Sequence, residues 1–230
     1  MRTFREIYAE AAARKGGPEA LEALLAEHRP KSREELAATP DDRWLAQMTK
    51  CVFQAGFSWR VIDNKWPGFE TAFHGFAPGV NAAMSDDEFD AHLKDSGIVR
   101  NAAKILSVRD NARFLVELAA EHGSAARFFA LWPDDDFVGL LEVMKKRAAR
   151  LSGETAMRCF RFMGRASFIT TRDVTAALIG AGVIDKPATS KKDLQAVQDA
   201  FNVWGRESGR DLTSLSRVLA LSTGPEGYGR

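Results

Sequence analysis

The chain has 230 residues, of which 45% are hydrophobic and 27% are charged, and its formal net charge is +1. This length and composition are typical of a soluble globular protein with one well-buried domain or two small lobes that share a core. The small net charge excludes a simple polycation, and no apolar run approaches the length of a membrane span. Residues 1–16 lack the apolar centre of a signal peptide, so we expect a cytoplasmic protein.

The pattern of apolar residues predicts an all-α fold, because helical spacing recurs along the chain and strand-type alternation is essentially absent. Ser32 and Ser85 each begin a predicted capping box with an acid three residues on, and Ser58 is expected to cap the helix that starts at Trp59. Gly123 is expected to end the longest helix. The predicted helices cover residues 1–16, 40–55, 101–122, 190–205 and 211–221.

Positive charge is concentrated between Lys145 and Arg172, where eight cations face the single acid Glu154. This segment carries a charge of +7 and the rest of the chain −6. A concentrated cationic stretch on a nearly neutral protein favours a polyanion bound at one place. The alternative is a solvated basic helix face, and on charge alone the two interpretations are about equal.

An ordered set of short motifs runs from Trp44 to Glu117, about a third of the chain. It opens with the turn QAGFSW at residues 54–59 and closes with NAR at residues 111–113. The remaining matched residues are Phe69, Phe73, Phe76, Ala83, Met84, Asp95, Gly97, Ile98, Arg100, Asn101, Lys104 and Ile105. In this order the motifs resemble the 3-methyladenine DNA glycosylase I family of base-excision repair enzymes.

The chain departs from that family in two places. The family's base-reading glutamate falls at Cys51, and the cysteines and histidines that bind a structural zinc in the family have no counterpart here. The four histidines of this chain are isolated, so we interpret them as surface or capping residues and expect no metal. Cys51 and Cys159 lie in apolar helical contexts, which predicts two buried thiols and no disulfide framework.

A second resemblance lies at residues 151–156, Leu-Ser-Gly-Glu-Thr-Ala, between two predicted helices. It is similar to a shortened form of the hairpin of the helix-hairpin-helix glycosylase superfamily, in which backbone N–H groups at a helix start bind a DNA phosphate. The resemblance assigns Ser152, Gly153 and Thr155 to that contact; the alternative is a plain connection between two helices. The flanking cations are assigned to further phosphate contacts: Lys145, Lys146, Arg147 and Arg150.

The same superfamily places a catalytic aspartate one helix and one loop after its hairpin, and Asp173 resembles it in spacing. Cleavage of an N-glycosidic bond develops oxocarbenium-like charge on the sugar, which a fixed carboxylate stabilises. We therefore assign Asp173 as catalytic and expect it to face a cleft near Trp59. The alternative is an acid that satisfies a helix N-terminus. Asp185, expected at the end of the same helix, is the reserve candidate.

A different alignment matches residues 167–170, Ser-Phe-Ile-Thr, to the hairpin of the 3-methyladenine glycosylase I family. It puts Thr170 where that family has glycine and leaves Asp173 without a catalytic counterpart. It also gives residues 151–156 no role, so we rank it second.

A glycosylase must rotate its target base out of the DNA stack, which requires an aromatic pocket. Stacking on a cationic alkylated purine gains further from cation–π attraction. We assign the pocket to Trp59, Trp66, Phe57, Gln54 and Cys51. For Trp66, which precedes Pro67, packing in the core is an equal alternative.

The sequence thus predicts an all-α, two-lobed helix-hairpin-helix glycosylase-like domain over residues 1–222 and a flexible tail over residues 223–230. The expected function is a monofunctional DNA glycosylase for alkylated purines, because no lysine lies at a recognisable Schiff-base position. It would act on double-stranded DNA with a damaged base, as a monomer, without a cofactor and without a membrane. The alternatives are a non-catalytic, lesion-probing DNA-binding relative, supported by Cys51, and a helical protein-interaction module.

Overall fold

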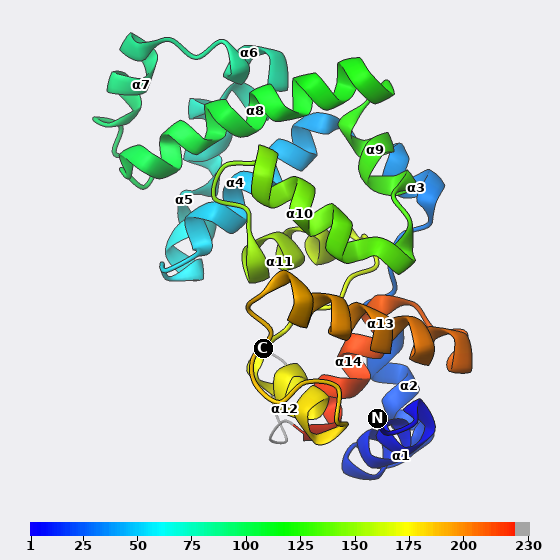
Figure 1. The fold of residues 1–230 in the computed structure, drawn as a ribbon. Coiled ribbons are helices and arrows are strands. Elements are labelled where there is room, and N and C mark those ends of the chain that lie inside the picture. Colours follow the sequence, from blue (N-terminus) through cyan, green and yellow to red (C-terminus); the bar gives the residue numbers. More distant parts are fainter. Residues whose placement is uncertain (224–230) are drawn as a thin grey trace. The chain divides into compact units, whose positions relative to one another are not determined.

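A computed structural model describes residues 1–223 of the chain, and over these residues the fold is entirely helical (Figure 1). The predicted all-α class is therefore confirmed. The helices are α1 (Phe4–Arg14), α2 (Pro18–Ala26), α3 (Arg33–Ala37), α4 (Asp41–Gln54), α5 (Trp59–Ala72), η1 (His74–Phe76), α6 (Pro78–Ala82), α7 (Asp86–His92), α8 (Ala102–His122), α9 (Ala125–Leu131), η2 (Asp134–Asp136), α10 (Phe137–Arg147), α11 (Gly153–Met163), α12 (Arg172–Gly180), α13 (Lys191–Ser208) and α14 (Leu212–Thr223).

These helices form two compact units whose segments interleave along the chain. Unit 1 consists of Met1–Lys31, Pro133–Gly139 and the chain from Gly164 onward; unit 2 consists of Ser32–Trp132 and Leu140–Met163. The chain thus enters unit 2 after α2 and returns to unit 1 twice. Of the predicted tail, Thr223 ends α14, and residues 224–230 lie outside the described part of the chain.

The core of unit 2 is built on α4, which packs against α8 and α11. Trp44 of α4 is fully buried, with its ring centroid 4.5 Å from that of Phe129 and 6.2 Å from that of Phe160. Phe53, nine residues further along the same helix, packs edge-on against Phe69 at 4.7 Å. Buried aromatic pairs of this kind add about 0.5–1.5 kcal/mol each beyond the burial of their area. They fix α4, which carries one wall of the site described below.

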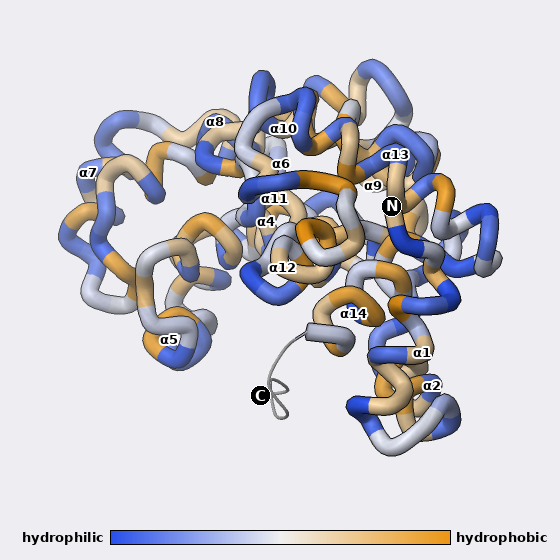
Figure 2. The backbone as a smooth tube through the Cα atoms, turned by 60° about the horizontal axis from the view of Figure 1, so that its bottom comes forward, coloured by the Kyte–Doolittle hydropathy of each residue, from blue (hydrophilic) through white to orange (hydrophobic). Residues whose placement is uncertain are grey.

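The core of unit 1 joins the two ends of the described chain, because α1 packs against α14 and α14 against α12. Trp204 of α13 is buried and its indole N–H donates to the backbone oxygen of Arg2 at 3.1 Å. Phe168 lies between Phe137 and Phe201, with centroid separations of 5.1 and 4.9 Å. Figure 2 shows apolar and polar stretches alternating along the helices of both units, as expected of helices with one buried side.

Most helix ends agree with the predicted caps. Ser32 forms a complete capping box with Glu35, Asn101 caps α8, and Gly123 ends it with φ +86°. Ser85 caps α7, but Glu88 makes no return bond to it and instead bonds His74 at 2.8 Å. Ser58 stands at the N-cap position of α5 as predicted, but its side chain makes no cap bond, so the prediction of a side-chain cap was wrong.

One histidine contradicts the expectation that all four lie at the surface. His92 is buried at the end of α7, and its ring lies 4.9 Å from that of Phe73. Burial lowers the pKa of His92, and the nearby negative charge of Glu88 raises it by a smaller amount. The imidazole therefore packs as a neutral ring in the aromatic cluster under α7, a role that its isolated place in the sequence does not indicate.

Candidate functional site

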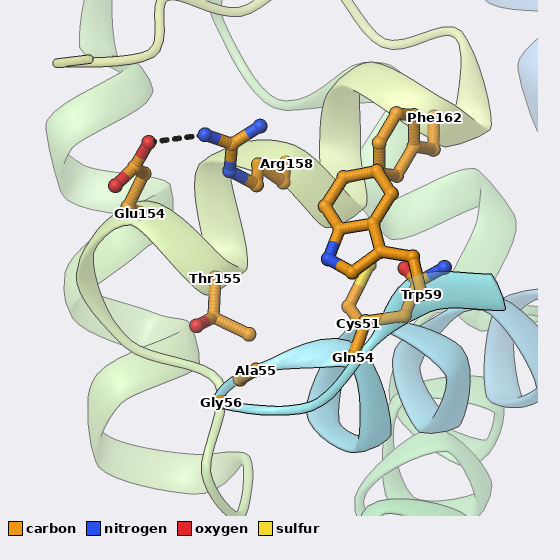
Figure 3. A pocket seen from close by; sticks show the side chains of 9 residues that line it. All are labelled: Cys51, Gln54, Ala55, Gly56, Trp59, Glu154, Thr155, Arg158 and Phe162. Carbon is orange, nitrogen blue, oxygen red and sulfur yellow. Dashed lines mark hydrogen bonds and ion pairs between the residues drawn. The ribbon is translucent and has the colours of Figure 1, made fainter. Parts of the chain in front are cut away.

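A pocket of about 320 Å³ opens in unit 2 between the α4–α5 junction and one face of α11 (Figure 3). Its two walls come from segments about a hundred residues apart in the sequence. Its lining residues are Cys51, Gln54, Ala55, Gly56, Trp59, Glu154, Thr155, Arg158 and Phe162. The first five belong to the end of α4, the following turn and the start of α5; the other four lie on α11.

The turn between α4 and α5 is held by a buried lysine. Lys104 of α8 donates from Nζ to the backbone oxygens of Phe53 at 3.1 Å and Ala55 at 2.7 Å. These carbonyls end α4, where a helix leaves its oxygens without intrahelical donors and a cation is favourable. Burial lowers the pKa of Lys104, with a smaller contribution from the charge of Arg150. Gly56 then reverses the chain with φ +75°, a conformation that favours glycine.

Two exposed aromatic rings form one side of the pocket. Trp59 and Phe162 lie edge to face with centroids 6.0 Å apart, and 45% and 47% of their surfaces are exposed. The guanidinium of Arg158 lies 5.9 Å from the Trp59 ring. Most of the other large rings are buried or partly buried, and these two exposed rings provide a flat apolar surface for a planar ligand.

The polar lining consists mainly of one amide and one ion pair. Gln54 is 94% buried, yet its side-chain amide makes no hydrogen bond with any residue of the described chain. Glu154 accepts from Arg158 at 2.6 Å, the bond drawn in Figure 3. The amide atoms of Gln54 are not fully enclosed, so they remain open to the pocket. Gln54 therefore offers a ligand a hydrogen-bond donor and an acceptor that no residue of the described chain already occupies.

Cys51 lies at the floor of the pocket and is 5% exposed. Its sulfur accepts from Gln47 Nε2 at 3.3 Å, and the Cys159 side chain on α11 is the neighbour with the largest effect on its pKa. The pKa of Cys51 is lowered, chiefly by the interaction with Cys159. The bond from Gln47 and the charges of Arg158 and Lys50 lower it further, whereas burial acts in the opposite direction. The same contact and burial raise the pKa of the Cys159 thiol. Both cysteines are buried and free, as the sequence predicted.

The structure brings some of the sequence-assigned pocket residues together and leaves others out. Cys51, Gln54 and Trp59 line one pocket with Thr155. Phe57 is exposed on the turn, with Lys104 Nζ 4.7 Å from its ring centroid, and does not line the pocket. Trp66 stacks between Phe69 and Phe76 at 5.5 and 5.3 Å, which agrees with the packing alternative.

The loop before α11 has the backbone form of a tight connection. Arg150 and Gly153 both adopt left-handed φ values, +60° and +53°, and Ser152 between them is exposed. A Cβ at Gly153 would meet no atom within 4 Å, so the space in front of the first turn of α11 is open. A helix leaves its first N–H groups without intrahelical acceptors, so those of α11 can bind a ligand in this open space.

The cations predicted to surround this loop differ in their surroundings. Lys145, Lys146 and Arg150 are exposed and have no ion-pair partner among residues 1–223. Arg147, by contrast, donates to Glu117 at 3.2 Å and to Glu121 at 3.0 Å. Arg165, counted within the same charged segment, is only 3% exposed and pairs with Asp134 in unit 1. The segment of charge +7 is therefore not one surface stripe.

Asp173 lies in unit 1, in the first turn of α12, where Thr171 caps the helix through a bond from the N–H of Val174. The Asp173 carboxylate is half-buried and makes no bond within the described residues; only its backbone oxygen is engaged, by Thr223 at 2.8 Å. Asp185 lies beyond α12, which ends at Gly180, so its expected place at the helix end was wrong.

The family assignment comes from the sequence that surrounds this pocket. Residues 37–169, more than half of the chain, match the model of the family described as methyladenine glycosylase. The chain belongs to the methyladenine glycosylase family. The matched region includes both walls of the pocket, and it ends at Ile169, before α12 and Asp173.

Two curated members of the methyladenine glycosylase family are similar to part of the chain. The chain is 34% identical over 65 residues to DNA-3-methyladenine glycosylase 1 of Escherichia coli (strain K12), which covers 28% of this chain and 35% of the relative. It is 37% identical over 60 residues to DNA-3-methyladenine glycosylase of Haemophilus influenzae, which covers 26% and 32%. The chain thus aligns with about a third of the length of these relatives.

Two solved structures of the family are also similar to the chain. A crystal structure of 3-methyladenine DNA glycosylase I aligns with a TM-score of 0.47 and 24% identity over 60% of this chain and 80% of that one. A second, in complex with 3-methyladenine, aligns with a TM-score of 0.49 and 19% identity over 68% and 90%.

The sequence alone missed the α11 wall of the pocket apart from Thr155. Glu154, Arg158 and Phe162 recur at intervals of four residues, the spacing of one helical face. This pattern of an acid, a base and an exposed aromatic on an otherwise amphipathic helix is the signal that would have identified them.

No helix of the described residues is long and apolar enough to cross a membrane. Nor does residue range 1–223 contain a group of three His, Cys, Asp or Glu side chains placed to hold a metal ion.

Proposed function

We propose that this protein is a DNA glycosylase that removes an alkylated purine from double-stranded DNA after rotating the nucleotide out of the helix. The observation that carries the proposal is the pocket of about 320 Å³ between the α4–α5 turn and α11, inside the region matched by the methyladenine glycosylase family. Its exposed Trp59 and partnerless Gln54 amide suit a planar heterocycle with hydrogen-bonding edges. The two relatives are named for the excision of 3-methyladenine.

In this proposal the purine stacks on Trp59 and presents an edge to Gln54. An amide supplies both a donor and an acceptor, the pair that adenine requires at its amino and ring nitrogens. A methylated purine that carries positive charge gains additional attraction over the indole face, on the order of 1–2 kcal/mol. Phe162, edge to face with Trp59, limits the depth to which the base enters.

The DNA backbone is proposed to bind at the start of α11. Ser152, Gly153 and Thr155 offer backbone N–H groups and the positive end of the helix dipole to a phosphate. Lys145, Lys146 and Arg150 add unpaired positive charge nearby along the same segment. Arg147 contributes less, because two glutamates already neutralise it.

For the chemistry, we keep Asp173 as the proposed carboxylate that stabilises the oxocarbenium-like sugar. Its carboxylate makes no bond within the described chain, whereas Thr171 performs the capping role that was the alternative for Asp173. Glu154, the only carboxylate in the lining of the pocket, is the competing candidate, and it forms an ion pair with Arg158. The two candidates belong to different units and are separable by mutation.

The deciding experiment measures abasic sites released from DNA that contains 3-methyladenine or 7-methylguanine, under single-turnover conditions. Asp173→Asn should lower the excision rate by orders of magnitude and leave DNA affinity and thermal stability close to the parent. Asp185→Asn is the matched control and should excise normally. If Glu154→Gln is slow and Asp173→Asn is normal, the catalytic role belongs to Glu154.

The second candidate is a non-catalytic relative that binds damaged DNA, favoured by the thiol of Cys51 at the position of the family's glutamate. The same assay separates the two functions. A parent protein that binds alkylated DNA in preference to undamaged DNA but releases no base has the second function. A parent protein with no salt-dependent DNA binding has neither.

A further inference from the structure

Two thiols that lie 108 residues apart in sequence are in contact beneath the pocket. Cys51 comes from α4 and Cys159 from α11, two helices that pack directly on each other in unit 2. Each side chain has the largest effect on the pKa of the other, which places the two thiols next to each other where α4 packs on α11. Cys51 lines the pocket, whereas Cys159 is 1% exposed and lies behind it. The pair is therefore asymmetric: a small molecule in the pocket reaches the first sulfur and is shielded from the second.

We propose that Cys51 and Cys159 form a peroxide-oxidised dithiol, in which Cys51 reacts with hydrogen peroxide and Cys159 then closes an intramolecular disulfide. Hydrogen peroxide is close to water in size, and the pocket of about 320 Å³ admits it to the Cys51 sulfur. The site is distinct from the proposed glycosylase chemistry, since neither step involves DNA.

Both steps balance with hydrogen peroxide as the oxidant. In the first, the Cys51 thiolate attacks one peroxide oxygen, an S–O bond forms, the O–O bond breaks, and the departing hydroxide takes a proton to become water. In the second, the Cys159 sulfur attacks the sulfenic sulfur of Cys51. An S–S bond forms, the S–O bond breaks, and the hydroxyl group leaves as water with the thiol proton of Cys159.

The environment of each sulfur supports this order. The interaction with Cys159, the bond from Gln47 and the charges of Arg158 and Lys50 favour the thiolate of Cys51 and lower its pKa. The raised pKa of Cys159, from the same contact and from complete burial, keeps that thiol protonated. Thiolates and not thiols attack peroxides, so Cys51 reacts first. Among residues 1–223 these are the only cysteines, which leaves no third thiol to compete.

A disulfide here would link the two walls of the pocket. Gln54 and Trp59 follow Cys51 on one wall, and Thr155, Arg158 and Phe162 surround Cys159 in sequence on the other. The bond needs the two sulfur atoms to approach to about 2.05 Å, closer than any non-bonded contact, so α4 and α11 must move together slightly. Oxidation would therefore narrow the pocket at its floor and remove the thiol that a ligand meets there.

The test treats the purified full-length protein with hydrogen peroxide and needs no DNA. We expect the intact mass to fall by two hydrogen atoms, the titratable thiols to disappear, and dithiothreitol to reverse both changes. Peptide mapping without reduction should find one cross-link, between the peptides that contain Cys51 and Cys159. Because the readout is mass, its outcome is independent of whether the protein excises bases.

Two variants assign the roles of the two sulfurs. Cys159→Ala should stop at the sulfenic acid of Cys51, which dimedone traps, and should then over-oxidise. Cys51→Ala should leave Cys159 unmodified under the same exposure. The proposal is overturned if the parent protein keeps both thiols, if it gains oxygen atoms without a cross-link, or if the only disulfide links two molecules. The parent protein alone decides these three outcomes, whatever the stability of the variants.

Discussion

At the scale of single residues, Lys104 shows how a charged side chain positions the pocket without lining it. Its ammonium group bonds the two carbonyls that end α4, and its burial lowers its pKa. The motif match marked Lys104 as a family residue, but spacing alone gives no reason to expect a lysine beneath a turn. The reason is the unpaired carbonyl oxygens of the α4 C-terminus, which become visible only when α8 is seen to cross behind that turn.

Lys104→Met should therefore destabilise the protein, because it leaves the carbonyls of Phe53 and Ala55 buried without a donor. Bonds to a charged group contribute about 1.5–3 kcal/mol each, and relief of the buried charge offsets part of the loss, so we expect a net change of about 1–3 kcal/mol in the free energy of unfolding. Urea unfolding measures it. Lys94→Met, at an exposed position, is the control and should stay within about 0.5 kcal/mol of the parent.

The lowered pKa of Cys51 predicts how the rate of its oxidation depends on pH. Since the thiolate reacts, the rate of oxidation should fall as the pH drops through the pKa of Cys51 in the folded protein. That midpoint should lie below the midpoint of an unperturbed cysteine measured in the same way. Stopped-flow measurement of thiol loss against pH, with free cysteine as the reference, gives both midpoints. A midpoint at or above that of free cysteine contradicts the assigned environment.

Several pocket residues were predictable from the sequence and others were not. The resemblance of the QAGFSW turn to the glycosylase family indicated Gln54 and Trp59, and the structure places both at the junction of α4 and α5. Trp66 lies two turns further along α5, where its indole stacks on the rings of Phe69 and Phe76 instead of lining the pocket. Phe162 needed the structure, since only the packing of α11 on α4 brings it to Trp59.

At the scale of elements, α11 combines three features in eleven residues. Its first residue is Gly153 in a left-handed conformation, one face lines the pocket, and the opposite face is buried in the core. The sequence predicted the helix and its start from the hairpin resemblance. It did not predict that the charged segment on either side would divide between two units, because charge counting ignores where the chain turns inward.

Gly153→Ala should destabilise the protein by about 1–2 kcal/mol, because a Cβ is strained at φ +53° even though the space around it is open. Gly180→Ala is the matched control: it also has open space, but its φ is in the ordinary range at the end of α12. There the substitution should stabilise by about 0.4–1 kcal/mol through the unfolded state. Thermal unfolding of both variants tests the pair; equal changes of the same sign would contradict the argument.

The cations flanking this helix should differ in their effect on DNA binding. Arg150→Ala and Lys146→Ala remove exposed, unpaired charge and should each weaken binding and lower the magnitude of the salt slope by about one. Arg147→Ala should have a smaller effect, because its guanidinium is already paired with Glu117 and Glu121 and is less available to a phosphate. Fluorescence anisotropy at several salt concentrations provides the slopes. Equal slopes for all three variants would show that the ion pairs of Arg147 do not matter.

At the scale of the whole molecule, the all-α class followed directly from helical periodicity, whereas the division into units did not. Hydrophobic spacing identifies a buried face and leaves the partner of that face unspecified. The packing of α1 against α14 joins segments from opposite ends of the described chain, and no local pattern encodes this pairing. Long-range pairing of this kind is decided by the sum of many apolar contacts.

Oxidation of the Cys51–Cys159 pair should raise the thermal stability of the protein. The disulfide would close a loop of roughly 100 residues, and restriction of the unfolded chain contributes about 4–5 kcal/mol in the loop-entropy model, before any strain. For a protein of this size the melting temperature should then rise by on the order of 10 °C. Calorimetry of oxidised and reduced samples measures the shift, and Cys51→Ala treated in the same way should show none.

The interleaving of the two units also bears on the order in which a newly made chain can fold. Unit 2 is complete in sequence once Met163 has left the ribosome, whereas α1 must wait for α14 before its apolar side is covered. Synthesis from the N-terminus therefore lets the inserted unit fold first and the enclosing unit last. During that interval the side of α1 that carries Phe4, Ile7 and Ala11 has α2 beside it but lacks the cover that α14 later provides.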